Sequence, residues 1–255
     1  MKNIVLLFFM CSLSCLCQDN CGNVLYKVTG TYDIIYYTMR FSNKYSYYEE
    51  TKIQKESEKI EVLKENGNVI KNVTIQKQSL KPMFFFNDRK ELYFLTEYVS
   101  GKTDIVKETN IKWDWKILPD EKKIGNFTVQ KATAKFRGSS FTGWFTNTIP
   151  LPYGPWKAKG LPGIILEIYD DNNLLHITAI KVSLTGENCK NPIDKMIFKN
   201  SIDIYTFLKK EKQEDVDFIK KLNAKLPKGA KKFNVNEDCD DCPKQLKLEN
   251  FEEKF

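Results

Sequence analysis

The sequence predicts a mainly β fold of the α+β type, with a single curved antiparallel sheet or half-open barrel and amphipathic helices near the C-terminus. Short runs of alternating apolar and polar residues, separated by turn signals, recur from residue 22 to residue 184. An aromatic content of 13%, mostly Phe and Tyr, also favours strands. From residue 201 the apolar residues recur at helical spacing instead. Strands followed by helices indicate one sheet with helices on a face or at an end. A closed, lipocalin-like barrel is the alternative.

The first 17 residues are typical of a cleaved export signal. Lys2 precedes an unbroken apolar run at 4–10, which is too short for a membrane span of about 20 apolar residues. Cleavage is expected before Gln18, because small residues lie three and one positions before it. Lipidation at Cys15 is the alternative. No later stretch of the sequence reaches the length of a membrane span, so the expected location is the periplasm or cell envelope, or the exterior.

The strands are predicted from alternation and the turns between them. In the first part of the chain they are expected at residues 22–30, 34–41, 45–48, 60–65, 69–76, 91–99, 102–108 and 112–118. Asn66-Gly67-Asn68 is a hairpin signal that pairs the strands beside it, and an apolar run at 83–86 ends at a turn. Residues 123–184 predict four or five further strands, and 201–226 predict one long or two short helices. Residues 18–230 are thus expected to form a single domain, followed by a polar tail at 231–255.

The segment from residue 153 to residue 168 is the most informative part of the chain. Pro162 fixes its own φ and favours an extended Leu161, so Gly163 is predicted to take the positive φ of a type II turn. The apolar run that follows predicts a strand covered on both faces, which returns through a turn at 170–173 into a strand at 174–182. A functional alternative is that the bend presents backbone N–H groups to a ligand. No Lys-Ser/Thr pair follows Gly163, which excludes a phosphate-binding P-loop.

Several short motifs in this region resemble those of the GLPGLI family of secreted bacterial proteins. The hallmark stands here as Gly160-Leu161-Pro162-Gly163-Ile164-Ile165, preceded in order by Trp113-Asp114-Trp115, Phe136-Arg137-Gly138 and Gly143-Trp144-Phe145-Thr146. The resemblance spans residues 22–185 and is strongest from Trp113 onward. It implies a secreted protein, and it carries over no catalytic residue, because the family has no established activity.

Cleavage before Gln18 would leave four cysteines, namely Cys21, Cys189, Cys239 and Cys242. An even number of cysteines in an exported protein predicts disulfides, although four cysteines allow three pairings. Cys239 and Cys242 are close enough to pair with each other, which would leave Cys21 with Cys189. A metal site or a redox centre at this acidic Cys-x-x-Cys sequence is the alternative to a surface disulfide. No metal or cofactor is predicted.

The charge and the single histidine restrict the classes of function. The formal net charge is +7, but the only arginines are Arg40, Arg89 and Arg137, which disfavours nucleic acid as a partner. Lysines concentrate at 190–232, where they predict a solvated face or, alternatively, a contact with anionic lipid head groups. His176 is the only histidine and no Gly-x-Ser-x-Gly motif occurs, so no catalytic residue is predicted.

Four tryptophans lie within 44 residues, at positions 113, 115, 144 and 156. Their expected role is the core, and a ligand cleft is the alternative. The candidate ligand-binding residues are Trp144, Trp156, Gly160, Leu161, Pro162 and Gly163. The sequence predicts an exported, non-enzymatic binding or chaperone-like protein whose concave apolar face holds a lipid, a peptide or an outer-membrane protein. The alternatives are an enzyme that uses carboxylates or the Cys239/Cys242 pair, and a pure protein-interaction module.

Overall fold

The computed structural model describes residues 21–30, 34–51, 83–86, 91–184, 198–227, 229 and 232. Its strands are β1 (Gly22–Gly30), β2 (Ile35–Ser42), β3 (Tyr45–Glu50), β4 (Met83–Phe86), β5 (Glu91–Glu97), β6 (Thr103–Glu108), β7 (Lys116–Ile124), β8 (Phe127–Phe136), β9 (Ser139–Thr146), β10 (Ile164–Asp170), β11 (Leu175–Leu184) and β12 (Ile202–Asp203). One helix follows, α1 (Ile204–Ala224). The fold is mainly β with a C-terminal helix, which confirms the predicted class.

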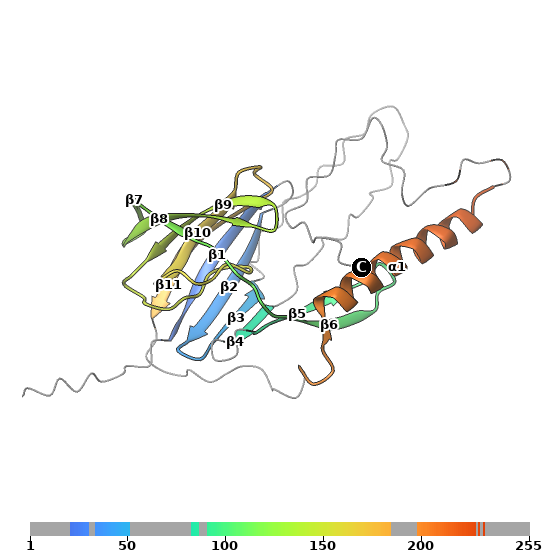
Figure 1. Ribbon diagram of the computed structural model, residues 1–255, viewed down its shortest axis with the longest axis horizontal. Helices are drawn as coiled ribbons and strands as arrows, with labels where there is room; N and C mark the ends of the chain where they lie inside the picture. Colours follow the sequence, from blue (N-terminus) through green and yellow to red (C-terminus); the bar gives the residue numbers. More distant parts are fainter. Residues whose placement is uncertain are drawn as a thin grey trace, which may run out of the picture.

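The strands form one hydrogen-bonded series in the order β12-β6-β5-β4-β3-β2-β1-β11-β10-β9-β8-β7. All pairs are antiparallel except β12 with β6. The eight strands from β3 to β7 in this order make the curved sheet in Figure 1, and β4, β5 and β6 lead from it toward α1. Among the described strands, β7 and β12 each pair on one side only, so the sheet is open and the closed barrel is excluded.

The main core lies on one face of this sheet. Tyr26, Tyr37 and Met39 of the central strands are almost completely buried there. They belong to the same packed cluster as Ile149 and Leu161 of the connection between β9 and β10. The β9–β10 connection therefore packs onto the core side of the sheet.

Helix α1 packs apart from this core. Its buried residues, Ile204 and Phe207, form a separate cluster with Tyr98 and Val106. The helix begins after Asp203, whose side chain accepts hydrogen bonds from the backbone N–H groups of the first turn, as a helix N-cap does. Among the described residues, no helix combines the length and the apolar character that a membrane span requires.

One predicted strand boundary differs from the structure, and one predicted hairpin is not tested by it. The strand expected at 112–118 begins only at Lys116, because the residues before it contact the β9–β10 connection through their side chains. The predicted hairpin at 60–65 and 69–76 lies outside the described residues.

Cys21 is buried and disulfide-bonded. Cys189, Cys239 and Cys242 lie outside the described residues, so no disulfide has both of its cysteines among them. The expected pairings therefore stay predictions.

Candidate functional site

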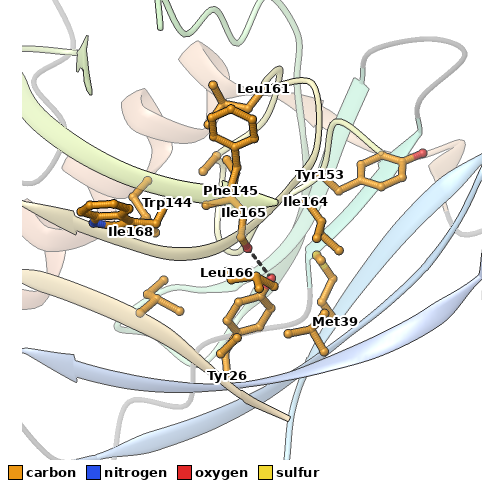
Figure 2. Packing of buried hydrophobic residues seen from close by; sticks show 14 of the residues in the cluster. Tyr26, Met39, Trp144, Phe145, Tyr153, Leu161, Ile164, Ile165, Leu166 and Ile168 are labelled. Atoms are coloured by element: carbon orange, nitrogen blue, oxygen red, sulfur yellow. Dashed lines mark hydrogen bonds between the residues drawn. The ribbon is translucent and has the colours of Figure 1, made fainter. Parts of the chain in front are cut away.

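The start of β10 is tied to the chain around it by three hydrogen bonds. The N–H groups of Ile164 and Ile165 donate to the carbonyl oxygens of Ile149 and Tyr153, at 3.0 and 2.9 Å. The buried hydroxyl of Tyr26 donates to the carbonyl oxygen of Ile165 at 2.7 Å, as the dashed line in Figure 2 shows. These bonds fix the β9–β10 connection against the core.

The bend before β10 differs from the predicted type II turn. Positive φ occurs at Gly160, at +95°, and not at Gly163. Gly163 is needed for another reason: a Cβ atom there would lie 2.0 Å from the carbonyl oxygen of Thr146 and 2.6 Å from its carbonyl carbon. The type II turn is therefore wrong, and the close approach of two backbones explains the glycine.

The indole rings of Trp113 and Trp115 also hold the β9–β10 connection in place. The N–H of Trp113 donates to the carbonyl oxygen of Lys157 at 2.9 Å, and that of Trp115 donates to the carbonyl oxygen of Lys159 at 2.8 Å. The two rings are stacked, with centroids 4.9 Å apart. The spacing of two residues between the tryptophans thus matches the spacing between the two carbonyls. We call this pair of bonds the indole clamp.

Trp156 directly precedes Lys157, whose carbonyl the indole clamp holds, and it has a strained conformation. Its φ is +54°, a region that bulky residues rarely adopt. Its ring packs against Phe141 and Phe136, with centroids 5.7 and 5.9 Å away. The ring of Trp113 meets it edge-on at 6.1 Å. Trp156 is thus half-buried.

A small hollow lies beside Trp156. It leaves about 20 Å³ for the centre of a water-sized sphere and is partly open to solvent. It is lined by Ser46, Leu92, Ile111, Tyr153, Gly154, Trp156, Lys157, Ala158 and Lys159. We call it the Trp156 hollow. Its lining comes from β3, β5, Ile111 and residues 153–159, so segments far apart in the sequence meet here.

A buried ion cluster reaches the Trp156 hollow. The Glu108 side chain is fully buried and contacts the guanidinium of Arg137. Its other oxygen lies 2.9 Å from the ammonium of Lys157, which is itself buried. Lys157 therefore presents to the hollow a side chain fixed by a carboxylate. Glu108 was missed by sequence reasoning, because an acid at a strand end gives no sign of its burial.

A second polar group of residues lies on the other face of the sheet. Lys131, Trp144, Glu167 and Thr178 are direct neighbours across β8, β9, β10 and β11. Side chains at such positions share one face of a sheet. Glu167 reaches this face because β10 carries one extra residue, Leu166, which shifts the alternation of the strand.

Glu167 is the centre of this group. Its side chain is 10% exposed and contacts the ammonium of Lys122. Its other oxygen lies 2.8 Å from Nε2 of His176 and 3.4 Å from the hydroxyl of Thr178. Burial raises the pKa of Glu167, but hydrogen bonds from Lys122 and His176 outweigh burial and hold this pKa below its ordinary value.

His176 is placed differently from the base of a hydrolase. The same ring nitrogen, Nε2, lies 2.8 Å from Glu167 and 3.0 Å from the Thr178 hydroxyl. A relay from nucleophile to orienting acid uses both ring nitrogens. This geometry therefore gives Thr178 no base that Glu167 orients. Among the described residues, His, Cys, Asp and Glu also form no group of three that could hold a metal ion.

The predicted ligand-binding residues fall into two places. Trp156 borders the hollow and Leu161 is buried beside it in the core, while Gly160 and Pro162 are exposed on the same connection. Trp144 lies apart. Its neighbour Gly143 faces Trp115 and Leu161, so Trp144 points to the other side of β9. Figure 2 shows Trp144 and Tyr153 at opposite sides of the picture.

Comparison with known proteins gives a likeness of fold only. No family model and no curated protein matches the chain. The chain is similar to solved structures of PNGF-II in two crystal forms, C2 and P21, each with a TM-score of 0.51. The identities are 14% and 15%, and each match covers 77% of this chain. The chain spans about a third of the PNGF-II chains, 33% and 34%. At these low identities the comparison shows a likeness of fold alone.

Proposed function

We propose that the chain is an exported, non-enzymatic binding protein of the cell envelope, of the GLPGLI type, which takes a small apolar group into the Trp156 hollow. The observation that carries this proposal is the left-handed conformation of Trp156 at the edge of that hollow. The export signal and the resemblance support the location. The resemblance assigns no chemistry, so the ligand is argued from the hollow itself.

The left-handed conformation of Trp156 costs free energy, and contacts with neighbouring residues maintain it. A left-handed conformation costs a bulky L-residue about 1–2 kcal/mol. The indole clamp holds the neighbouring carbonyl of Lys157, and Phe136 and Phe141 hold the ring. Strain that the surroundings maintain in this way is concentrated at binding sites, where it fixes a side chain in its working orientation. Trp156 is therefore the expected contact residue for the ligand.

The size and lining of the hollow define the group that fits. Typical small-molecule pockets hold about 300–1,000 Å³. The hollow leaves only about 20 Å³ for the centre of a water-sized sphere, so it suits a methyl-sized apolar tip and not a whole small molecule. Leu92, Ile111 and Ala158 offer apolar contact, and Ser46 and Lys159 offer polar contact at the same site. A ligand with a small apolar end beside a polar group matches this lining.

Native mass spectrometry of the protein purified from its own envelope fraction tests the proposal. We expect a bound lipid or peptide, and its mass distinguishes the two. Trp156→Gly removes the ring and relaxes the positive φ, so it should abolish the bound species. Trp156→Phe keeps a ring in place and should retain it.

Phe218→Ala on α1 is the matched control, because Phe218 is an exposed aromatic residue away from the hollow. An empty parent protein whose tryptophan emission no amphiphile changes would contradict the proposal. Unchanged binding by the folded Trp156→Gly variant would also contradict it.

A further inference from the structure

We infer that Lys122, Lys131 and Trp144 form a binding site for an oxyanion such as a phosphate, sulfate or carboxylate group. We call these three residues the lysine–tryptophan patch. It is separate from the Trp156 hollow, because Trp144 points to the other side of β9 from the residues that contact the clamped connection.

The patch is built by strand register and not by one mobile loop. Lys131 on β8 is the direct neighbour of Trp144 on β9, and Glu167 on β10 is the next neighbour. Lys122 reaches the same ring from β7. Side chains directly opposite each other on antiparallel strands have Cβ atoms about 4.5–5.5 Å apart, so the backbone holds these groups together.

Two positive charges converge on one indole ring. The ammonium of Lys122 lies 4.3 Å from the ring centroid of Trp144, and that of Lys131 lies 5.9 Å from it. Glu167 contacts Lys122. Within the part of the chain that the structure describes, Lys131 has no ion pair. The patch therefore has one more cation than its single carboxylate balances, and an added anion between the two lysines would reduce their repulsion.

The indole supplies an independent indication of a ligand. Trp144 is 9% exposed, and its Nε1 atom is buried with no hydrogen-bond partner among the described residues. A buried donor without an acceptor is destabilising, because it has lost its hydrogen bond to water and gained none in return. The indoles of the clamp show the opposite state, since both N–H groups donate to carbonyls. The Trp144 N–H is thus a donor without an acceptor among the described residues. It belongs to the same ring that the ammonium groups of Lys122 and Lys131 approach.

Glu167 positions one of the two cations. Its oxygens are engaged by Lys122, His176 and Thr178. The remaining donors, Lys131 and the Trp144 N–H, match the acceptor oxygens of an oxyanion, and charge-assisted hydrogen bonds of this kind are the strong ones.

Indole N–H signals of the purified full chain provide a residue-specific test. We expect the ¹⁵N–¹H signal of Trp144, assigned with Trp144→Phe, to shift saturably as sodium phosphate replaces sodium chloride at constant ionic strength. The signals of Trp113 and Trp115 serve as internal controls and should stay in place, because their N–H groups already donate to carbonyl oxygens. Parallel titrations with sulfate and acetate identify the preferred oxyanion.

Variants and vesicles complete the test. Lys131→Gln should weaken the apparent affinity roughly tenfold or more, the loss expected for one charge-assisted hydrogen bond. Lys135→Gln, which removes an exposed lysine from the same strand, should leave the affinity unchanged. Co-sedimentation with phosphatidylglycerol vesicles, but not with phosphatidylcholine vesicles, would assign the anion to a lipid head group. Binding of the free anion alone would assign it to a soluble ligand.

The inference is overturned if the Trp144 signal does not move up to about 100 mM anion, far above the Kd of a weak site. It is also overturned if all four indole signals move together, or if Lys131→Gln binds as tightly as the parent.

Discussion

The hydroxyl of Tyr26 donates a 2.7 Å hydrogen bond to the carbonyl oxygen of Ile165, 139 residues away in the sequence. Ile165 precedes the extra residue of β10, where the pairing with β9 shifts its register. The bond therefore joins the central strand β1 to the point at which β10 departs from regular geometry. Burial also raises the pKa of Tyr26 well above its ordinary value, so the hydroxyl keeps the proton that it donates.

Tyr26→Phe should destabilise the protein by about 1–3 kcal/mol, because the buried carbonyl of Ile165 loses its hydroxyl donor while the ring is kept. Urea unfolding measures this change. Tyr36→Phe on β2 is the matched control and should change stability by less than about 0.5 kcal/mol. Equal effects of the two variants would show that the hydroxyl bond contributes nothing specific.

Gly163→Ala should cost about 3 kcal/mol, since the new methyl group would collide with the backbone of Thr146. Gly125→Ala, at a φ of +57° with no atom near the new methyl group, should cost only about 1 kcal/mol of backbone strain. Thermal melts of the two variants check the order. A larger effect at Gly125 would reject the close approach as the reason for Gly163.

Trp115→Phe should loosen the connection between β9 and β10, because it removes the N–H that donates to Lys159 and keeps an aromatic ring. Hydrogen exchange at the amides of Gly160 and Ile165, which bond to Pro152 and Tyr153, should accelerate. Amides of β1 should keep their protection. Uniform acceleration across the sheet would instead indicate general destabilisation.

The contribution of Glu167 to stability should depend on pH. Its pKa in the folded protein is held below the ordinary value of 4.5, so its stabilising contribution is present above pH 4.5 and is lost as the pH falls through the folded pKa. Glu167→Gln should therefore flatten the acid side of the stability curve, which urea unfolding at a series of pH values measures. A parallel curve for the parent and the variant would contradict this assignment.

Alternation and turn signals were enough to predict the class of the fold and most strand positions. The β10–β11 hairpin, the two strands after residue 34 and the C-terminal helix all appear close to their predicted places. The register of β10 against β9 could not be predicted in this way. The run Ile164–Ile168 gives no sign that Leu166 is the extra residue, because every residue in the run except Glu167 is apolar.

The residues around the Trp156 hollow could be predicted only where neighbouring residues in the sequence marked them. Trp156 and Gly160 stood out through turn chemistry, although the positive φ of each is seen only in the three-dimensional structure. The indole clamp joins residues 44 positions apart, and Glu108 meets Lys157 at a similar separation. Such partners depend on the order of strands in the sheet. No window along a single sequence contains that information.

The position of β1 has a consequence for the order of folding. Its neighbours are β2, close in the sequence, and β11, which ends at Leu184. The hairpins β2–β3 and β8–β9 need only short loops to close, whereas the β1–β11 ladder must bring together segments separated by most of the domain, which slows its formation. A chain that emerges from its N-terminus would hold its first strand with one edge unpaired until the eleventh had been made.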